Sequence, residues 1–219
     1  MVKVLEGQIK GVEKGYKPEV QVYAEFLTDL LACLAHESET LYKQFKTDVC
    51  NLFYQESFFL MSERTLRKWQ IIMRHYLARD QGSQGLFEEL LLKYNRAEGL
   101  LVSKKWELAQ KSLTFKRLAF LVYSSNVDEH SFDEQLDHLL KKMTEGFKST
   151  AKDPEMRMQL FLLSRIIMLR LTSAQLAEAL RKLWPHLLAE LVSVFDVEPG
   201  QKRDYRLTIE GIKIVELMS

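Results

Sequence analysis

The side chains best spaced to bind a metal ion are Glu134 and His138, which lie four residues apart in a segment with helical spacing. On a helix this spacing places two ligands on one face, as a zinc site requires. The neighbouring Asp133 and Asp137 favour another interpretation, because acidic side chains in a first helical turn are stabilised by the helix dipole. We therefore predict a solvated acidic face at this point and no metal site.

The cysteines offer a second candidate metal site, since Cys33 lies three residues before His36. A zinc finger needs further cysteine or histidine ligands at defined spacing, and none accompanies this pair. Cys33 and Cys50 both fall in apolar, helical stretches, and the sequence has no Asn-x-Ser/Thr signal. We interpret both as buried free thiols in a reducing compartment.

The sequence carries none of the familiar catalytic motifs. Gly82 and Gly85 belong to a turn, without the Gly-Lys-Ser/Thr that completes a phosphate-binding loop. A Gly-x-Ser-x-Gly nucleophile elbow is also missing, and no nucleophile, base and orienting group cluster along the chain. We predict a protein that is not an enzyme and that uses no cofactor.

Segregated charge points to binding instead. Between Ser62 and Arg79 the one acidic residue is Glu63, and at 100° per residue the basic side chains fall opposite an apolar stripe. Ile71 lies in the middle of this basic arc, where it has no core to join. We expect an exposed face that binds a partner through Arg64, Arg67, Lys68, Ile71 and Arg74.

A second basic stretch contains Lys104, Lys105 and Lys111, with Glu107 as its one acid before residue 117. Charged arcs on helices are often no more than the solvated side, and that plainer interpretation stays open. If these arcs do bind, they suit an acidic protein partner or an anionic membrane surface.

The elements that position these residues are predicted to be long helices. The 219 residues include 9 glycines and 4 prolines, too few for many turns. Helix starts are expected after Ser62, Ser103, Asp153 and Thr172, and a capping box at Ser131 with Glu134. About nine helices result. We expect Pro185 to kink or restart one of them.

The helix from Glu155 to Leu171 is apolar almost all round, which predicts a central, buried position. Its apolar block from Leu160 to Leu171 is interrupted by Arg165 and Arg170, so it does not suit a membrane span. Because an unpaired charge is costly inside a protein, we expect at least Arg165 to pair with a carboxylate or with carbonyls at a helix end. Solvent exposure of the guanidinium is the alternative.

Successive helix pairs span roughly 40 residues, which predicts an all-α fold of antiparallel pairs in a HEAT-like or armadillo-like α-solenoid. A compact helical bundle is the alternative, because no sharp sequence repeat occurs. The predicted organisation is a lead segment over 1–17, a helical-repeat domain over 18–197, a loop over 198–204 and a truncated final helix over 205–219.

The composition narrows the function further. With 31 Lys and Arg against 30 Asp and Glu, the chain lacks the basic footprint of a dedicated nucleic-acid binder. The N-terminal residues lack the apolar core of a signal peptide, which favours a cytosolic protein.

Three segments resemble the C-terminal region of the Dopey family, large proteins of Golgi and endosomal trafficking. The first is 58–61, Phe-Phe-Leu-Met, followed by Leu66, Trp69 and Ile72. The second is 116–120, Lys-Arg-Leu-Ala-Phe. The third and most specific is 161–170, which leads into Leu-Trp-Pro at 183–185 and on to Phe195. The chain departs from the family in the short link between Phe195 and Tyr205.

The resemblance implies a non-enzymatic scaffold or adaptor module of a larger protein in Golgi–endosome vesicle trafficking, peripheral on those membranes. It also implies a large partner of the Mon type, related to Arf exchange factors, together with phosphoinositide contact and a kinesin link. The alternative function is a peripheral membrane module whose basic helices bind anionic lipid. The matching motifs are mostly core positions, so the resemblance bears on the fold more than on the mechanism.

Overall fold

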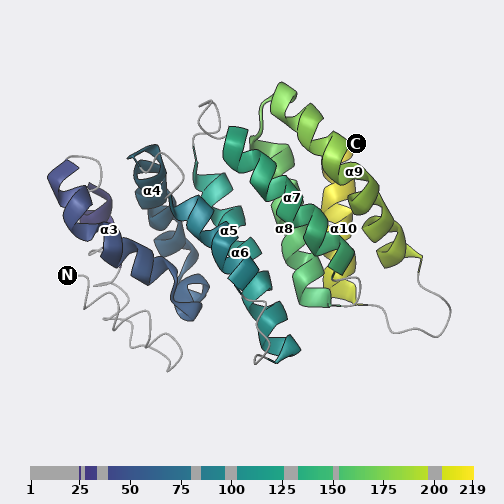
Figure 1. Cartoon of the computed structure of the whole chain (residues 1–219), viewed down its shortest axis with the longest axis horizontal. Helices are drawn as coiled ribbons and strands as arrows, with labels where there is room; N and C mark the ends of the chain where they lie inside the picture. The colour runs from purple at the N-terminus through teal and green to yellow at the C-terminus, as the bar shows by residue number, and fades with distance from the viewer. Residues whose placement is uncertain are drawn as a thin grey trace. The chain divides into compact units, whose positions relative to one another are not determined.

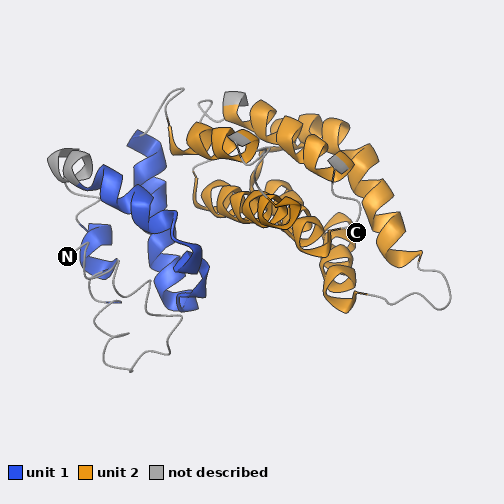
Figure 2. Ribbon diagram, turned by 60° about the horizontal axis from the view of Figure 1, so that its bottom comes forward, with its two compact units in different colours: residues 1–82 blue, residues 83–219 orange. Residues whose placement is uncertain are grey.

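The computed structural model describes residues 25, 28–33, 39–79, 85–96, 103–125, 133–149, 153–196 and 204–219. Every regular element in these residues is helical, which confirms the all-α prediction (Figure 1). The chain divides into two compact units, Met1–Gly82 and Ser83–Ser219, which are described separately (Figure 2). Residues 1–17 and most of the predicted 198–204 loop lie outside the described residues, and the predicted single domain over 18–197 stays a prediction.

In the first unit, α3 (Glu39–Phe53), the short 3₁₀ helix η2 (Glu56–Leu60) and α4 (Glu63–Arg79) share an aromatic core. The ring of Phe58 lies 5.0 Å from that of Phe53 and 5.3 Å from that of Trp69, in edge-to-face contacts. All three side chains are fully buried. The family-like 58–61 motif therefore supplies the centre of this unit.

The described residues of the second unit form three helix pairs: α5 (Leu86–Arg96) with α6 (Lys104–Ser124), α7 (Asp133–Ser149) with α8 (Pro154–Arg170), and α9 (Ser173–Phe195) with α10 (Tyr205–Met218). The first helices of each pair pack on one another, α5 on α7 and α7 on α9. The second helices form a parallel layer, α6 on α8 and α8 on α10. This two-layer stack confirms a solenoid-like arrangement.

Most helix starts follow the predicted local signals. The Ser103 side chain accepts a hydrogen bond from the Trp106 amide, and Asp153 accepts one from Met156 ahead of Pro154. Thr172 forms a capping box with Gln175. The capping box predicted at Ser131 lies outside the described residues.

The structure corrects two details of the sequence analysis. Helix α9 is continuous and has Pro185 inside it, so of the two predicted effects, a kink or a restart, the restart is wrong. Pro185 is exposed, and the carbonyl of Arg181 that loses its partner lies on the same side of the helix, where water can reach it. Cys33 is exposed rather than buried, whereas Cys50 is half-buried and its sulfur lies 2.8 Å from the Tyr76 hydroxyl.

Helix α8 is central to the second unit, as predicted, because it packs against α6, α7, α9 and α10. The two arginines that interrupt its apolar sequence, Arg165 and Arg170, both have polar partners. The Arg165 guanidinium forms an ion pair with Glu210 of α10, and Arg170 donates to the Ser125 carbonyl at the end of α6. The predicted pairing of Arg165 is therefore confirmed. Among the described helices, none is long and apolar enough to cross a bilayer.

Replacing Arg165 with methionine should lower the free energy of unfolding by about 1 kcal/mol, because a half-buried carboxylate loses its stronger partner. The loss is modest because Lys213 also lies 2.6 Å from Glu210. Urea denaturation followed by circular dichroism measures the change, and Lys213→Met serves as the exposed control. An unchanged Arg165→Met midpoint would show that the pair contributes nothing.

Candidate functional site

The outer face of α4 is formed by four side chains that recur at three- and four-residue steps: Arg64, Arg67, Ile71 and Arg74. All four are exposed, and Ile71 keeps 47% of its surface in contact with solvent. The structure thus places an aliphatic side chain among three arginines, as the helical projection of the sequence predicted. We call this set the α4 outer face.

The local sequence explains why this face points outward. The opposite side of α4 buries Trp69, Ile72, Met73 and Tyr76, which fixes the rotation of the helix. The Ser62 hydroxyl accepts a hydrogen bond from the Thr65 amide at 3.2 Å and caps the first turn.

Lys68 was predicted to lie on the exposed face of α4, but its side chain is mostly buried. Only 12% of its side chain is exposed, because its ammonium reaches the Asp29 carboxylate at 2.6 Å and the Glu25 carbonyl at 3.1 Å. These acceptors lie about 40 residues earlier in the chain, so the sequence of α4 alone did not reveal them. Lys68 holds the first unit together and is not part of the α4 outer face.

The arginines of the α4 outer face have neighbouring acids but stay accessible. Arg67 forms an ion pair with Glu63 at 2.6 Å, and Arg64 lies 3.4 Å from Glu25. Both guanidinium side chains remain 74% exposed. Exposed pairs of this kind are worth little, so either arginine can exchange its acid for that of a partner at small cost.

The lysines of the second basic stretch have different environments in the structure. Lys104 and Lys105 are exposed in the first turn of α6, beside a half-exposed Trp106. The sequence did not predict the exposure of Trp106. The stretch belongs to the second unit, and we treat it as a surface separate from the α4 outer face.

Lys111 is buried and does not belong to a binding surface. Its ammonium pairs with Glu107 at 2.7 Å and lies 5.1 Å from the ring centre of Tyr94. Lys142 of α7 approaches the same ring at 5.8 Å. The lysine therefore joins α5 to α6 through a cation–π contact, which the position of Glu107 four residues earlier only partly indicated.

The acidic segment at the start of α7 makes ordinary ion pairs. Asp137 lies 2.8 Å from the Lys182 ammonium, and His138 Nδ1 lies 2.9 Å from a Glu88 carboxylate oxygen. The hydrogen bond to Asp137, assisted by one to Glu178, raises the pKa of Lys182. In the described part of the chain, no three metal-binding side chains converge on one point. The Glu134 side chain and His36 lie outside it.

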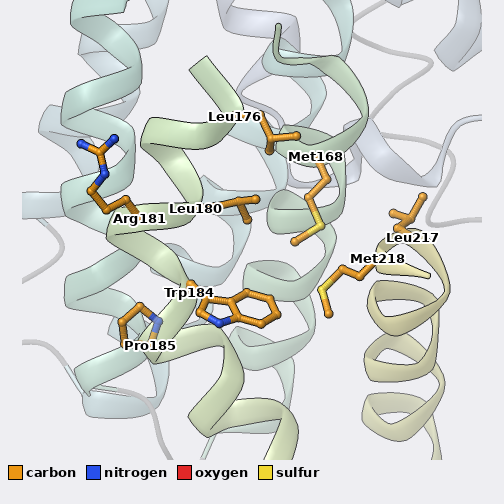
Figure 3. Close-up of a pocket in the computed structure, with 8 residues that line it drawn as sticks. All are labelled: Met168, Leu176, Leu180, Arg181, Trp184, Pro185, Leu217 and Met218. Carbon is orange, nitrogen blue, oxygen red and sulfur yellow. The ribbon is translucent and has the colours of Figure 1, made fainter. Parts of the chain in front are cut away.

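An apolar pocket of about 570 Å³ lies between α8, α9 and α10 (Figure 3). Its lining includes Met168, Trp184, Leu217 and Met218, and Figure 3 shows the side chains of Met168, Trp184 and Met218 directed toward one another from the three helices. Such a lining suits an aliphatic or aromatic group and provides no catalytic chemistry. The pocket was not predicted, because its residues come together only through the stacking of three helices.

Comparison with known proteins identifies the family. The DOP1 C-terminal family matches residues 13–214. A "Protein DOP1 homolog" of Drosophila pseudoobscura pseudoobscura is 27% identical over 170 residues, 76% of this chain. "Protein pad-1" of Caenorhabditis elegans is 25% identical over 148 residues, or 67% of the chain, and "Protein DOP1B" of Mus musculus is 25% identical over 153 residues, or 70%.

The chain spans about 6% of the length of each of these relatives. No solved structure matches it. The family match covers the described helices from α3 to α9 and most of α10, and it includes the segments on which the resemblance to the Dopey family rested. The chain belongs to the DOP1 C-terminal family.

Proposed function

We propose that this chain is a non-enzymatic scaffold module of a Dopey-type trafficking protein and that the α4 outer face binds an acidic protein partner. The observation that carries the proposal is the exposed Ile71 between Arg64, Arg67 and Arg74. An aliphatic side chain in this position gains little in the isolated chain, but it would be desolvated in a complex.

The arginines and the isoleucine have separate roles in this proposal. The exposed guanidinium groups attract an acidic partner and orient it, which mainly affects the association rate. Ile71 then provides the central apolar contact, which mainly affects the dissociation rate. The family resemblance makes the Mon-type scaffold the first partner to test and kinesin the second, on Golgi and endosomal membranes.

Reversing one charge of the α4 outer face tests the attraction. Arg67→Glu should weaken binding to the purified Mon-type scaffold about three- to tenfold at low salt and less at high salt, because screening removes the same attraction. Isothermal titration calorimetry at two salt concentrations measures the effect.

Arg181→Glu is the matched control for Arg67→Glu. Arg181 has the same 74% side-chain exposure and a similar ion pair, with Glu178 one helical turn away, but it lies on α9. An equal loss of affinity in both variants would mean that net charge, and not the α4 outer face, determines binding.

The second candidate function is contact with an anionic membrane, and the exposed Trp106 beside Lys104 and Lys105 favours it. An indole ring next to two lysines suits the interface between water and lipid headgroups. Cosedimentation with phosphatidylserine vesicles should then fall on Trp106→Ala. Vesicle binding that depends on Arg67 instead would assign the α4 outer face to lipid and contradict our first proposal.

A further inference from the structure

Helix α10 has two apolar faces. The inner face buries Leu207, Gly211 and Ile214, at steps of four and three residues, on the side of α8 and α9. Gly211 allows a close approach there, since an added Cβ would lie 3.2 Å from the Phe195 ring. A helix at the surface of a protein usually has a single apolar face, so a second apolar face on α10 indicates that another element covers it.

The outer face repeats the same spacing with exposed side chains. Tyr205, Ile209 and Ile212 follow one another at steps of four and three residues and are 74%, 51% and 44% exposed. On α9, Leu188 and Val192 are exposed one helical turn apart. Exposed apolar side chains thus form a row on each of these two helices, and such rows often mark interaction sites.

The remainder of the second unit shows what covers such faces. Helix α8 lies between α6 and α10, and α7 lies between α5 and α9, so each of these helices is packed on two sides by neighbours in its own layer. The outer faces of α9 and α10 have aliphatic rows of the kind that these packed interfaces use. They continue an interface that already occurs twice in each layer.

We propose that the outer faces of α9 and α10 bind a further amphipathic helix pair from the same polypeptide in a DOP1-length protein. This pair would extend both layers by one step. Its members would carry aliphatic side chains at three- and four-residue spacing, because only a helix presents such a row to α10.

The length of the relatives supports a helix pair from the same polypeptide as the group that covers these faces. The chain spans about 6% of each relative, so most of a DOP1-length polypeptide lies outside the matched region. A segment of the same polypeptide also binds at high effective concentration. A membrane fits less well, because the charges beside the outer row include Glu216 as well as Arg206 and Lys213.

The pocket at this end of the unit adds a specific contact. Trp184, Leu217 and Met218 line it and are themselves partly exposed. A large apolar side chain of the added pair would enter it. The methionines Met168 and Met218 can adapt their shape to that side chain.

A paired substitution tests the proposal. Ile209→Glu with Ile212→Glu is introduced into the 219-residue chain and at the aligned positions of the full-length Drosophila melanogaster DOP1 homolog, and hydrogen exchange of the α10 amides is measured. In the 219-residue chain, exchange should change less than about twofold, because both side chains face solvent. In the full-length protein, exchange of the matching helix should accelerate at least about tenfold, because a packed neighbour is lost.

Arg206→Gln is the control on the same helix and should change exchange in neither protein, because Arg206 is 72% exposed and lies 3.8 Å from Asp204. Unchanged exchange in the full-length double variant would overturn the proposal. So would self-association of the 219-residue chain, or its binding to phosphatidylserine vesicles, if the double variant abolished it, because the face would then belong to a second copy or to lipid. None of these results depends on the α4 outer face, so the two proposals stand or fall separately.

Discussion

Replacing Trp69 with alanine should lower the free energy of unfolding of the first unit by about 3 to 5 kcal/mol. Trp69 is fully buried, and its ring meets Phe58 edge to face at 5.3 Å. Phe58 also contacts Phe53, so the three rings join α3, η2 and α4. Alanine leaves a cavity at this junction, and the surrounding rings cannot all collapse into it.

Trp69→Phe is the matched control and should lose no more than about 1 kcal/mol. Among the described residues, no acceptor faces the buried Trp69 Nε1–H, so phenylalanine keeps an aromatic ring and removes an unsatisfied donor. Urea denaturation followed by circular dichroism compares the two variants. Equal losses would contradict this prediction, because the aromatic ring that phenylalanine keeps would then contribute nothing to stability.

Replacing Arg157 with alanine should lower the free energy of unfolding of the second unit by about 2 to 3 kcal/mol. Arg157 of α8 donates to the Glu190 carboxylate of α9 at 2.6 Å and also reaches the Glu190 carbonyl and the Ser193 hydroxyl. The two charged side chains are only 13% and 12% exposed. Removing the arginine leaves a largely desolvated carboxylate without its main partner.

Arg67→Ala is the comparison for this effect and should change stability by less than about 0.5 kcal/mol. The Arg67–Glu63 pair has the same 2.6 Å distance, but its side chains are 74% and 79% exposed. Thermal and urea unfolding of both variants distinguish the effect of side-chain burial on stability from the effect of the distance between the paired nitrogen and oxygen atoms. Similar losses in the two variants would contradict the view that desolvation decides what these pairs contribute.

The helices could be predicted because their starts depend on neighbouring residues. Ser103, Asp153 and Thr172 each cap a helix through an amide three positions later, which a sequence pattern records directly. The short η2 helix was not predicted. Its five residues, Glu56–Leu60, are too few for a periodic pattern, and packing of Phe58 against Trp69 helps to hold it in place.

The candidate site could be predicted only where its residues share one helix. Arg64, Arg67, Ile71 and Arg74 face outward together because the helical period relates them. Lys68 fits the same arc, but it is drawn to Asp29, nearly 40 residues away. Contacts between residues so far apart in the sequence depend on how the helices pack. The spacing of residues along one helix carries no information about that packing.

The exposed thiol and the continuous helix through Pro185 have similar causes. Cys33 sits in an apolar stretch, but the rotation of its helical segment, which buries Leu31, leaves the sulfur outside. Pro185 removes a hydrogen bond on the exposed side of α9, while Leu183 and Leu187 on the other side remain fixed in the core. In both cases tertiary packing overrides a local preference.

The most direct test of the central claim is the affinity of the Ile71→Asp chain for the purified Mon-type scaffold, compared with that of Leu60→Asp. Leu60 is an exposed aliphatic residue of the same unit outside the α4 outer face, so both variants add one negative charge in place of an exposed apolar side chain. Isothermal titration calorimetry should show at least about a tenfold loss of affinity for Ile71→Asp and less than about twofold for Leu60→Asp. Equal affinities for the two variants and the unmodified chain would contradict the claim that the α4 outer face is the docking surface.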